Sequence, residues 1–206
     1  MKVAVVGGTG QFGTALAGRL RDAGYDVVIG SRDAARAGAA AAEIGVEGAT
    51  NADAARAADL VILATKSEGA IETARELREA IGTTPVLSVA AELRFTAAGV
   101  EPTGEATSIA QRLQAELDAP VIAGLHSLAA SNLAGEVAPE EDALVCGDHA
   151  EAKAVALELA GRITGGAAVD AGPLASARAL EGMTAVIVNI NRRYKAHAGL
   201  RITGLS

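Results

Sequence analysis

The feature that most constrains the fold of this chain is a glycine-rich turn directly after its first hydrophobic run. The run Val3–Val6 has the length and composition of a short buried strand. The segment Gly7–Gly13, with the sequence GGTGQFG, follows at once and contains the pattern Gly-x-Gly-x-x-Gly. A stretch with helical spacing comes next, so the pattern lies in the strand–turn–helix context that dinucleotide-binding units require.

Each glycine of the pattern has a separate physical reason. Gly8 permits a tight turn, Gly10 lets the backbone approach a pyrophosphate without a Cβ in the way, and Gly13 permits close packing of the helix on the strand. The free N–H groups and the positive end of the helix then favour an anion. A tight βα turn alone would not explain three glycines at these offsets. The sequence therefore predicts a dinucleotide site over the loop from Gly8 to Gly13.

The end of the second predicted strand, 26–29, indicates which dinucleotide is bound. An NAD site usually places an acid there for the ribose diol, but this strand is followed by glycine, Ser31 and Arg32. Arg36 comes one helical turn after Arg32, and guanidinium groups suit phosphate oxygens. We therefore expect Ser31, Arg32 and Arg36 to bind the 2′-phosphate of NADP(H). Two alternatives are that both arginines are solvated surface charges, and that Asp33 weakens their field or caps the next helix.

Short runs rich in Val and Ile alternate with Ala-rich helical patterns through most of the chain. This order, with short connections, predicts an α/β fold of the Rossmann type: a doubly wound, mainly parallel sheet with helices on both faces. The expected strands are 3–6, 26–29, 59–64, 85–89, 120–123, 143–146 and 167–170, and the expected helices are 10–23, 33–44, 53–58, 67–81, 150–163 and 174–195.

The pattern changes after His126, and we expect two units. Residues 1–140 would form the NADP-binding Rossmann domain, and residues 141–206 a smaller C-terminal α/β unit that packs on it and mediates dimerisation. The last helical pattern carries apolar residues on several faces, which predicts burial against a second subunit and hence a homodimer. These residues are Leu180, Met183, Val186, Ile187, Val188 and Ile190.

Charge and composition exclude several classes of partner. A net charge of −7 disfavours nonspecific binding to nucleic acid. No apolar run approaches the ~18 residues of a membrane span, and the N-terminus reads as a strand rather than a signal sequence. The single Cys146 fits a reducing compartment and is expected in a buried strand rather than in a metal site. We expect a cytoplasmic protein with small-molecule partners and no metal.

Several segments together resemble one known family. They are the start MKVAVVGGTGQFG with VVIGSR at 27–32, the stretch 70–77, the stretch 125–127, the stretch 145–148, and VDAGPLASAR at 169–178 with its following helix through Ile190. The last segment matters most, because general dinucleotide-binding logic does not predict it. Over nearly its whole length the chain is similar to the NADPH-dependent coenzyme F420 reductases (F420H2:NADP oxidoreductases).

The resemblance implies transfer of a hydride between NADP(H) and the deazaflavin coenzyme F420. It implies that the two rings stack in a cleft between the two units, and that the protein holds them face to face and excludes water. Such chemistry needs no obligatory acid or base; His126 is the best polar candidate near the rings, and a structural role for it stays open. By position, Thr9, Gln11 and Phe12 with Gly10 would hold the pyrophosphate, Ser31, Arg32 and Arg36 the 2′-phosphate, and Thr65, Ser67, Ile71 and Ala130 the nicotinamide half.

Other functions on the same scaffold stay open. One is an NADPH-dependent reductase of a different acceptor, such as a flavin or a ferric chelate. Another is a non-catalytic NADP(H) sensor, since hydride transfer has no signature side chain. The basic stretch 191–197, with Arg201, is similarly ambiguous: it could receive the acidic tail of F420, or it could simply complement the dipole of a helix C-terminus.

Overall fold

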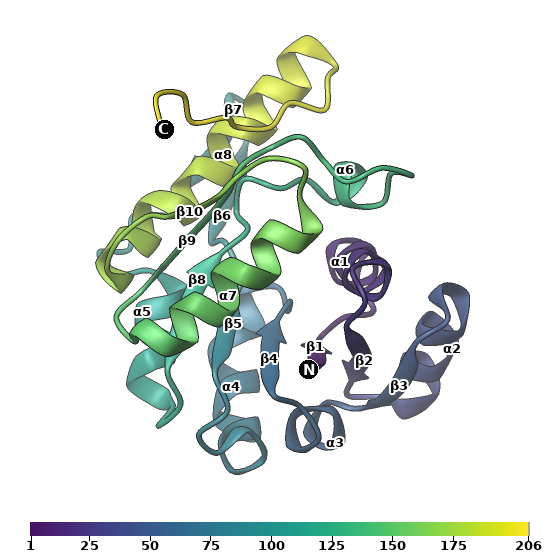
Figure 1. The fold of residues 1–206 in the computed structure, drawn as a ribbon. Helices are drawn as coiled ribbons and strands as arrows, with labels where there is room; N and C mark the ends of the chain where they lie inside the picture. The colour runs from purple at the N-terminus through teal and green to yellow at the C-terminus, as the bar shows by residue number, and fades with distance from the viewer. Residues whose placement is uncertain (206) are drawn as a thin grey trace.

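An eight-stranded sheet forms the centre of the structure, a computed structural model that describes residues 1–205 (Figure 1). The strand order is β10-β9-β8-β5-β4-β1-β2-β3, and neighbouring strands are parallel except for β8 and β9. The strands are β1 (Lys2–Val6), β2 (Asp26–Ser31), β3 (Glu47–Thr50), β4 (Leu60–Leu63), β5 (Val86–Ser88), β8 (Val121–Gly124), β9 (Ala143–Gly147) and β10 (Ala168–Asp170).

Helices cover both faces of this sheet, because alternate strand residues point to opposite sides. In β1, Ala4 and Val6 join one hydrophobic cluster, whereas Val3 and Val5 join the other. The first cluster is covered by α3 (Asn51–Arg56), α4 (Ser67–Ile81), α5 (Ile109–Glu116) and the start of α8 (Ala177–Tyr194). The second is covered by α1 (Gln11–Asp22), α2 (Ala34–Ile44), α7 (Ala150–Ile163) and the short α6 (Ala130–Leu133). The predicted Rossmann-type α/β class is confirmed.

Local sequence explains the helix that follows the glycine loop. In α1, Leu16 and Leu20 are fully buried at i and i+4 on the sheet side of the helix. The helix begins after Gly10 and ends before Gly24, which has a φ of +86°. A left-handed backbone of this kind favours glycine and stops the helix, as the sequence predicted.

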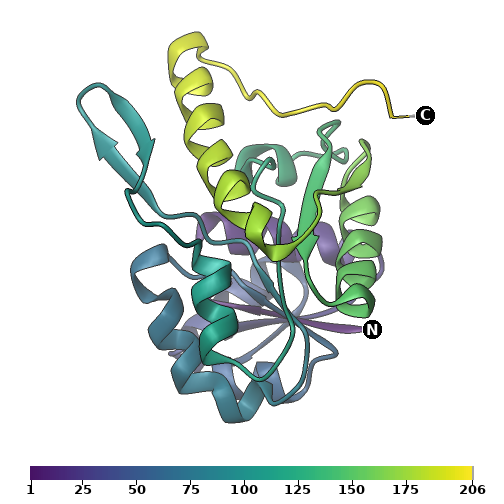
Figure 2. The same ribbon diagram turned by 90° about the vertical axis from the view of Figure 1, so that its left-hand side faces the viewer.

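A two-stranded hairpin outside the main sheet was not predicted. It consists of β6 (Leu93–Thr96) and β7 (Gly99–Pro102), and it projects beside α8 in Figure 2. The side-chain amide of Asn189 on α8 accepts from the N–H of Val100 at 2.8 Å and donates to its C=O at 2.7 Å. The amide thus continues the strand edge, and it fixes the hairpin against the helix.

The C-terminal part of the chain joins the same sheet. Strands β9 and β10 extend it beyond β8, and the expected last helix begins with a 3₁₀ turn (Leu174–Ser176) before α8. The chain then crosses back over the start of β9, where the carboxylate of Asp142 accepts from the N–H groups of Ala167 at 2.7 Å and Ile202 at 2.6 Å. A division into two units near residue 140 stays a prediction. Across residues 1–205, none of the helices combines the length and the apolar character needed to cross a membrane.

Candidate functional site

The glycine loop lies where β1 ends, between β2 and β4. Gly7 has a φ of +71°, and a Cβ added to it would lie 2.6 Å from Cγ2 of Thr65, at the end of β4. The N–H of Gly8 donates to the C=O of Val5 at 3.1 Å and to the C=O of Gly30 at 3.2 Å. The loop therefore turns sharply and stays hydrogen-bonded to β1 and to the neighbouring strand β2.

The remaining glycines of the pattern meet very different surroundings. A Cβ added at Gly13 would lie 2.6 Å from the Cα of Gly8, so α1 packs on the loop at backbone contact. A Cβ added at Gly10 would meet nothing within 4 Å. Gly10 is the N-cap of α1 and offers no side-chain cap, and the first turn carries no acidic residue. The first N–H groups of α1 are therefore suited to an anionic ligand group.

Asn51 supports the loop from the opposite side, and the sequence did not predict this role. It is the first residue of α3 and is buried. Its Oδ1 accepts from the N–H of Gly7 at 3.3 Å and would lie 2.9 Å from a Cβ added at Gly30. This one side chain therefore connects α3, the end of β2 and the first residue of the glycine loop.

The end of β2 carries the residues expected at a 2′-phosphate. Ser31 is buried, and its Oγ accepts from the N–H of Asp33 at 3.2 Å. The carboxylate of Asp33 caps α2 by accepting from the N–H groups of Ala35 and Arg36. Arg32 and Arg36 are exposed, and neither forms an ion pair with any acidic group in residues 1–205. Arg32 lies in the bend before α2, so helical spacing does not by itself bring the two guanidinium groups together.

Three buried polar atoms lack hydrogen-bond partners at the carboxyl ends of three neighbouring strands. They are Oγ1 of Thr65 after β4, Oγ of Ser88 at the end of β5, and Nδ1 of His126 after β8, each unpartnered within residues 1–205. Leaving a buried polar group unpaired costs about 1–3 kcal/mol. All three lie at the carboxyl ends of parallel strands, beside the glycine loop, on the side of the sheet where folds of this kind bind their ligands.

The protonation state of His126 follows from its contacts. Its Nε2 lies 3.1 Å from the C=O of Ala90, which can only accept, so Nε2 carries the proton and Nδ1 is a free acceptor. Burial lowers the pKa of His126 from 6.5 to about 4, so the ring is neutral at pH 7. The preceding Leu125 has a φ of +66°, a strained backbone that is held by a bond from its N–H to Leu144 C=O.

The other residues expected near the nicotinamide lie on separate elements around this edge. Ser67 is the first residue of α4, and Ala130 is the first residue of α6. Ile71, one turn into α4, packs against the hydrophobic cluster beneath α4 and α5. Their contact with a ligand stays a prediction, and so does that of Thr9, Gln11 and Phe12 in the loop.

Cys146 and the basic C-terminal stretch complete the candidates. Cys146 is fully buried in β9, and burial raises the pKa of its thiol to about 12, so it is an inert core residue. No cluster of three metal-ligating side chains occurs among residues 1–205. On α8, the guanidinium of Arg192 lies 5.3 Å from the ring centre of Phe95 on the hairpin. This cation–π contact gives one of the basic residues in the stretch 191–197 a structural role.

The sheet order, the glycine loop with the open N-terminus of α1, and the exposed Arg32 and Arg36 after β2 define a dinucleotide-binding α/β protein of the Rossmann class. A profile of the family described as "NADP oxidoreductase coenzyme F420-dependent" matches residues 2–92. The F420-dependent NADP reductase of Methanothermobacter thermautotrophicus is 36% identical, with 100% of this chain and 96% of that protein covered. The corresponding reductase of Methanocaldococcus jannaschii is 34% identical over 100% of this chain and 99% of its own.

A solved structure extends this likeness to the whole fold. A protein from Arthrobacter sp. FB24, described as a candidate F420-dependent NADP-reductase, superposes with a TM-score of 0.84 at 28% identity. The match covers 99% of this chain and 100% of that one. The chain belongs to the family of F420-dependent NADP oxidoreductases.

Proposed function

We propose that this protein is an F420-dependent NADP reductase, which transfers a hydride between NADP(H) and coenzyme F420. The observation that carries the proposal is the set of three unpartnered polar atoms beside the glycine loop, on Thr65, Ser88 and His126. The carboxamide of a nicotinamide and the pyrimidine edge of a deazaflavin both present donors and acceptors. They are the kind of group that these three atoms require.

The NADP end of the site would be held by charge and backbone. The N–H groups at the start of α1 would bind the pyrophosphate, because the N-cap Gly10 leaves them without a side-chain partner. Arg32 and Arg36, with Ser31, would bind the 2′-phosphate, and Asp33 does not compete because it caps α2. The ring end would lie near Thr65, Ser67, Ile71 and Ala130. NADH lacks the 2′-phosphate, so we expect it to bind much more weakly than NADPH.

In this reaction the protein has to position the two rings rather than to supply an acid or a base. When both coenzymes are bound, the hydride would pass from one ring carbon to the other, and the proton that completes the reduction of F420 would come from solvent. Neutral His126 offers a hydrogen-bond acceptor at Nδ1 and cannot take up a proton at pH 7. It would therefore orient a donor on one ring without exchanging protons, and the buried apolar residues beside it, Ala90 and Leu125, would help to exclude water.

We also propose that residues 141–206 serve acceptor binding and that two copies associate through α8. Val186, Ile190 and Tyr194 are exposed and recur every four residues, so they form one apolar stripe along this helix. Such a stripe supports the homodimer expected from the sequence. The buried members of the predicted set, Leu180 and Ile187, instead pack within the chain.

Mixing the purified protein with NADPH and oxidised F420 tests the activity. We expect loss of the deazaflavin visible absorbance with NADPH, and little loss with NADH. FMN and a ferric chelate are the control acceptors. Turnover of FMN without turnover of F420 would indicate a different reductase, and tight NADPH binding without turnover of any acceptor would indicate a sensor.

A further inference from the structure

The segment that carries Ala130 has little intrinsic stability of its own. Helix α6 spans four residues, too few for a stable isolated helix, and its N-cap Ala129 makes no side-chain cap. Residues 134–137 that follow contain no helix or strand. Because the segment is this weak locally, groups from elsewhere in the chain must fix its position. That position matters because the segment begins at Ala130, which we expect to contact the nicotinamide.

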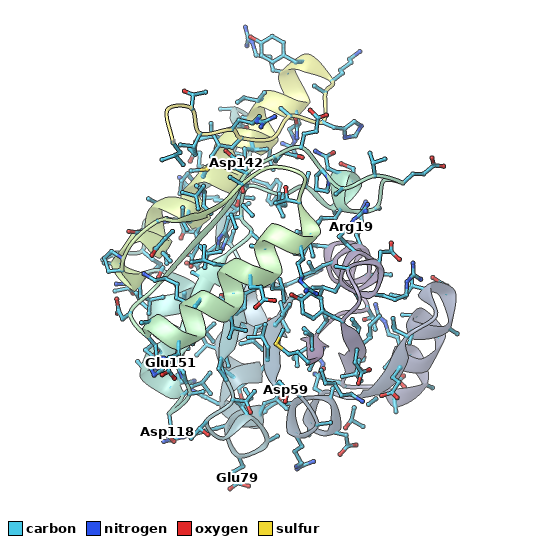
Figure 3. All side chains as sticks on the ribbon, in the orientation of Figure 1. Arg19, Asp59, Glu79, Asp118, Asp142 and Glu151 are labelled. Atoms are coloured by element: carbon cyan, nitrogen blue, oxygen red, sulfur yellow. The ribbon has the colours of Figure 1, made fainter. Side chains whose placement is uncertain are left out.

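Arg19 on α1 supplies that fixation. It is 8% exposed, and Figure 3 places it between α1 and the α6 segment. Its Nε and Nη2 donate to the C=O of Leu133 at 3.1 Å and 3.0 Å, and Nη2 also donates to the C=O of Val137 at 2.9 Å. A further bond reaches the C=O of Gly135. No acidic group of residues 1–205 forms an ion pair with Arg19, so backbone carbonyls are the partners of its charge.

The geometry suits arginine specifically. The planar guanidinium presents several donors in a fixed fork, whereas a lysine ammonium acts as a point charge on a flexible stem. These donors meet the carbonyls of Leu133, Gly135 and Val137 at the end of α6 and just after it. Only Leu133 is buried, so loss of Arg19 would be costly chiefly at that carbonyl. Arg19 therefore supplies hydrogen-bond donors to the carbonyls of this segment and fixes its position relative to α1.

Helix α1 also forms the other half of the site. It begins at Gln11 in the glycine loop, and Arg19 lies eight residues later, about 12 Å along the helix axis. We infer that Arg19 is a positioning residue for NADPH: it holds the segment from Ala130 at a fixed offset from the pyrophosphate-binding end of α1, and so sets the place of the nicotinamide. This inference rests on the proposed function.

Arg19→Met tests it, with Arg21→Met as the matched control. Arg21 lies on the same helix but is exposed, and it reaches only Ile44 C=O and Asp22. For Arg19→Met we expect kcat to fall about 10- to 100-fold, because small misplacements of a reacting ring have effects of that size. The KM for NADPH should rise as well. The Kd of adenosine 2′,5′-bisphosphate, which reads only the adenosine end, should stay within about twofold of wild type.

Two further variants keep the test decisive. Arg19→Lys preserves the charge and should lie between wild type and Arg19→Met, which also provides a folded variant if the methionine protein is unstable. Free guanidinium should partly restore the kcat of Arg19→Ala. The inference is overturned if folded Arg19 variants have the same kcat and KM as Arg21→Met. It is also overturned if their affinities for NADPH and for adenosine 2′,5′-bisphosphate fall by the same factor. A wild-type protein that binds no NADPH would instead overturn the proposed function, and this inference with it.

Discussion

Gly10 and Gly13 offer a paired test, because an added methyl group meets open space at one position and backbone at the other. At Gly13, the Cβ of alanine would lie 2.6 Å from Gly8 Cα and 2.9 Å from both Gly8 C and O. Alanine gains about 1 kcal/mol in helix propensity over glycine. The contacts involve backbone that cannot rotate away, and overpacking of this kind costs about 1–3 kcal/mol. The clash should therefore win, and Gly13→Ala should destabilise the protein.

At Gly10 the same substitution meets nothing within 4 Å, and the residue has a φ of −84° that alanine adopts without strain. Losing glycine at an N-cap costs less than about 1 kcal/mol, and the reduced entropy of the unfolded chain offsets part of it. The added methyl would, however, stand where the account places the pyrophosphate. Gly10→Ala should therefore keep its stability and lose affinity for NADPH by about tenfold or more, the equivalent of about 1.4 kcal/mol.

Thermal unfolding and NADPH titration separate the two effects. For a chain of this length, 1 kcal/mol shifts the Tm by about 2–4 °C, so we expect a small change for Gly10→Ala and a larger decrease for Gly13→Ala. A Gly10→Ala protein that binds NADPH like wild type would refute the placement of the pyrophosphate. A Gly13→Ala protein with wild-type Tm would refute the packing argument.

Three further outcomes are expected. Arg32→Ala and Arg36→Ala should each weaken NADPH binding about 10- to 100-fold, the loss expected for a charged hydrogen bond, and leave NADH binding unchanged in calorimetry; equal loss for both dinucleotides would contradict the 2′-phosphate assignment. Because the folded pKa of His126 is near 4 and its unfolded pKa near 6.5, only the unfolded chain gains this proton between those pH values, so the unfolding free energy should fall by about 3 kcal/mol as pH drops through that window. Denaturant titrations should show this decline in wild type, and a His126→Asn variant that keeps it in full would disprove the cause. In the homodimer proposed through α8, Ile190→Glu should give a monomer in light scattering without loss of Tm; a monomeric wild-type protein or an unchanged dimer mass would contradict this interface.

The elements that the sequence predicted are those with strong local patterns. The first strand, the glycine loop and α1 follow from one continuous segment, and Gly24 ends the helix as expected. Strand β3 escaped prediction because Glu47–Thr50 contains no large apolar residue. Helix α5 could have been found, since Ser108 and Gln111 form a capping box at its start.

Only part of the candidate site could be predicted from the sequence. The glycine and arginine positions follow from local rules, but the roles of Arg19 and Asn51 depend on partners that lie 114 and 44 residues away in the chain. The hairpin β6–β7 is held by Asn189, 89 residues beyond Val100, and no local pattern announces this contact. Side chains that act on distant backbone leave no periodic signal, so only the tertiary structure reveals them.

We propose that a hydride passes directly between the rings of NADPH and F420 at the carboxyl ends of β4, β5 and β8. Mass spectrometry of F420 reduced by the purified protein with NADPH deuterated at both C4 positions tests it most directly. We expect each reduced deazaflavin to carry one deuterium on carbon in light water. Reduced F420 that carries hydrogen from the solvent instead would contradict direct transfer.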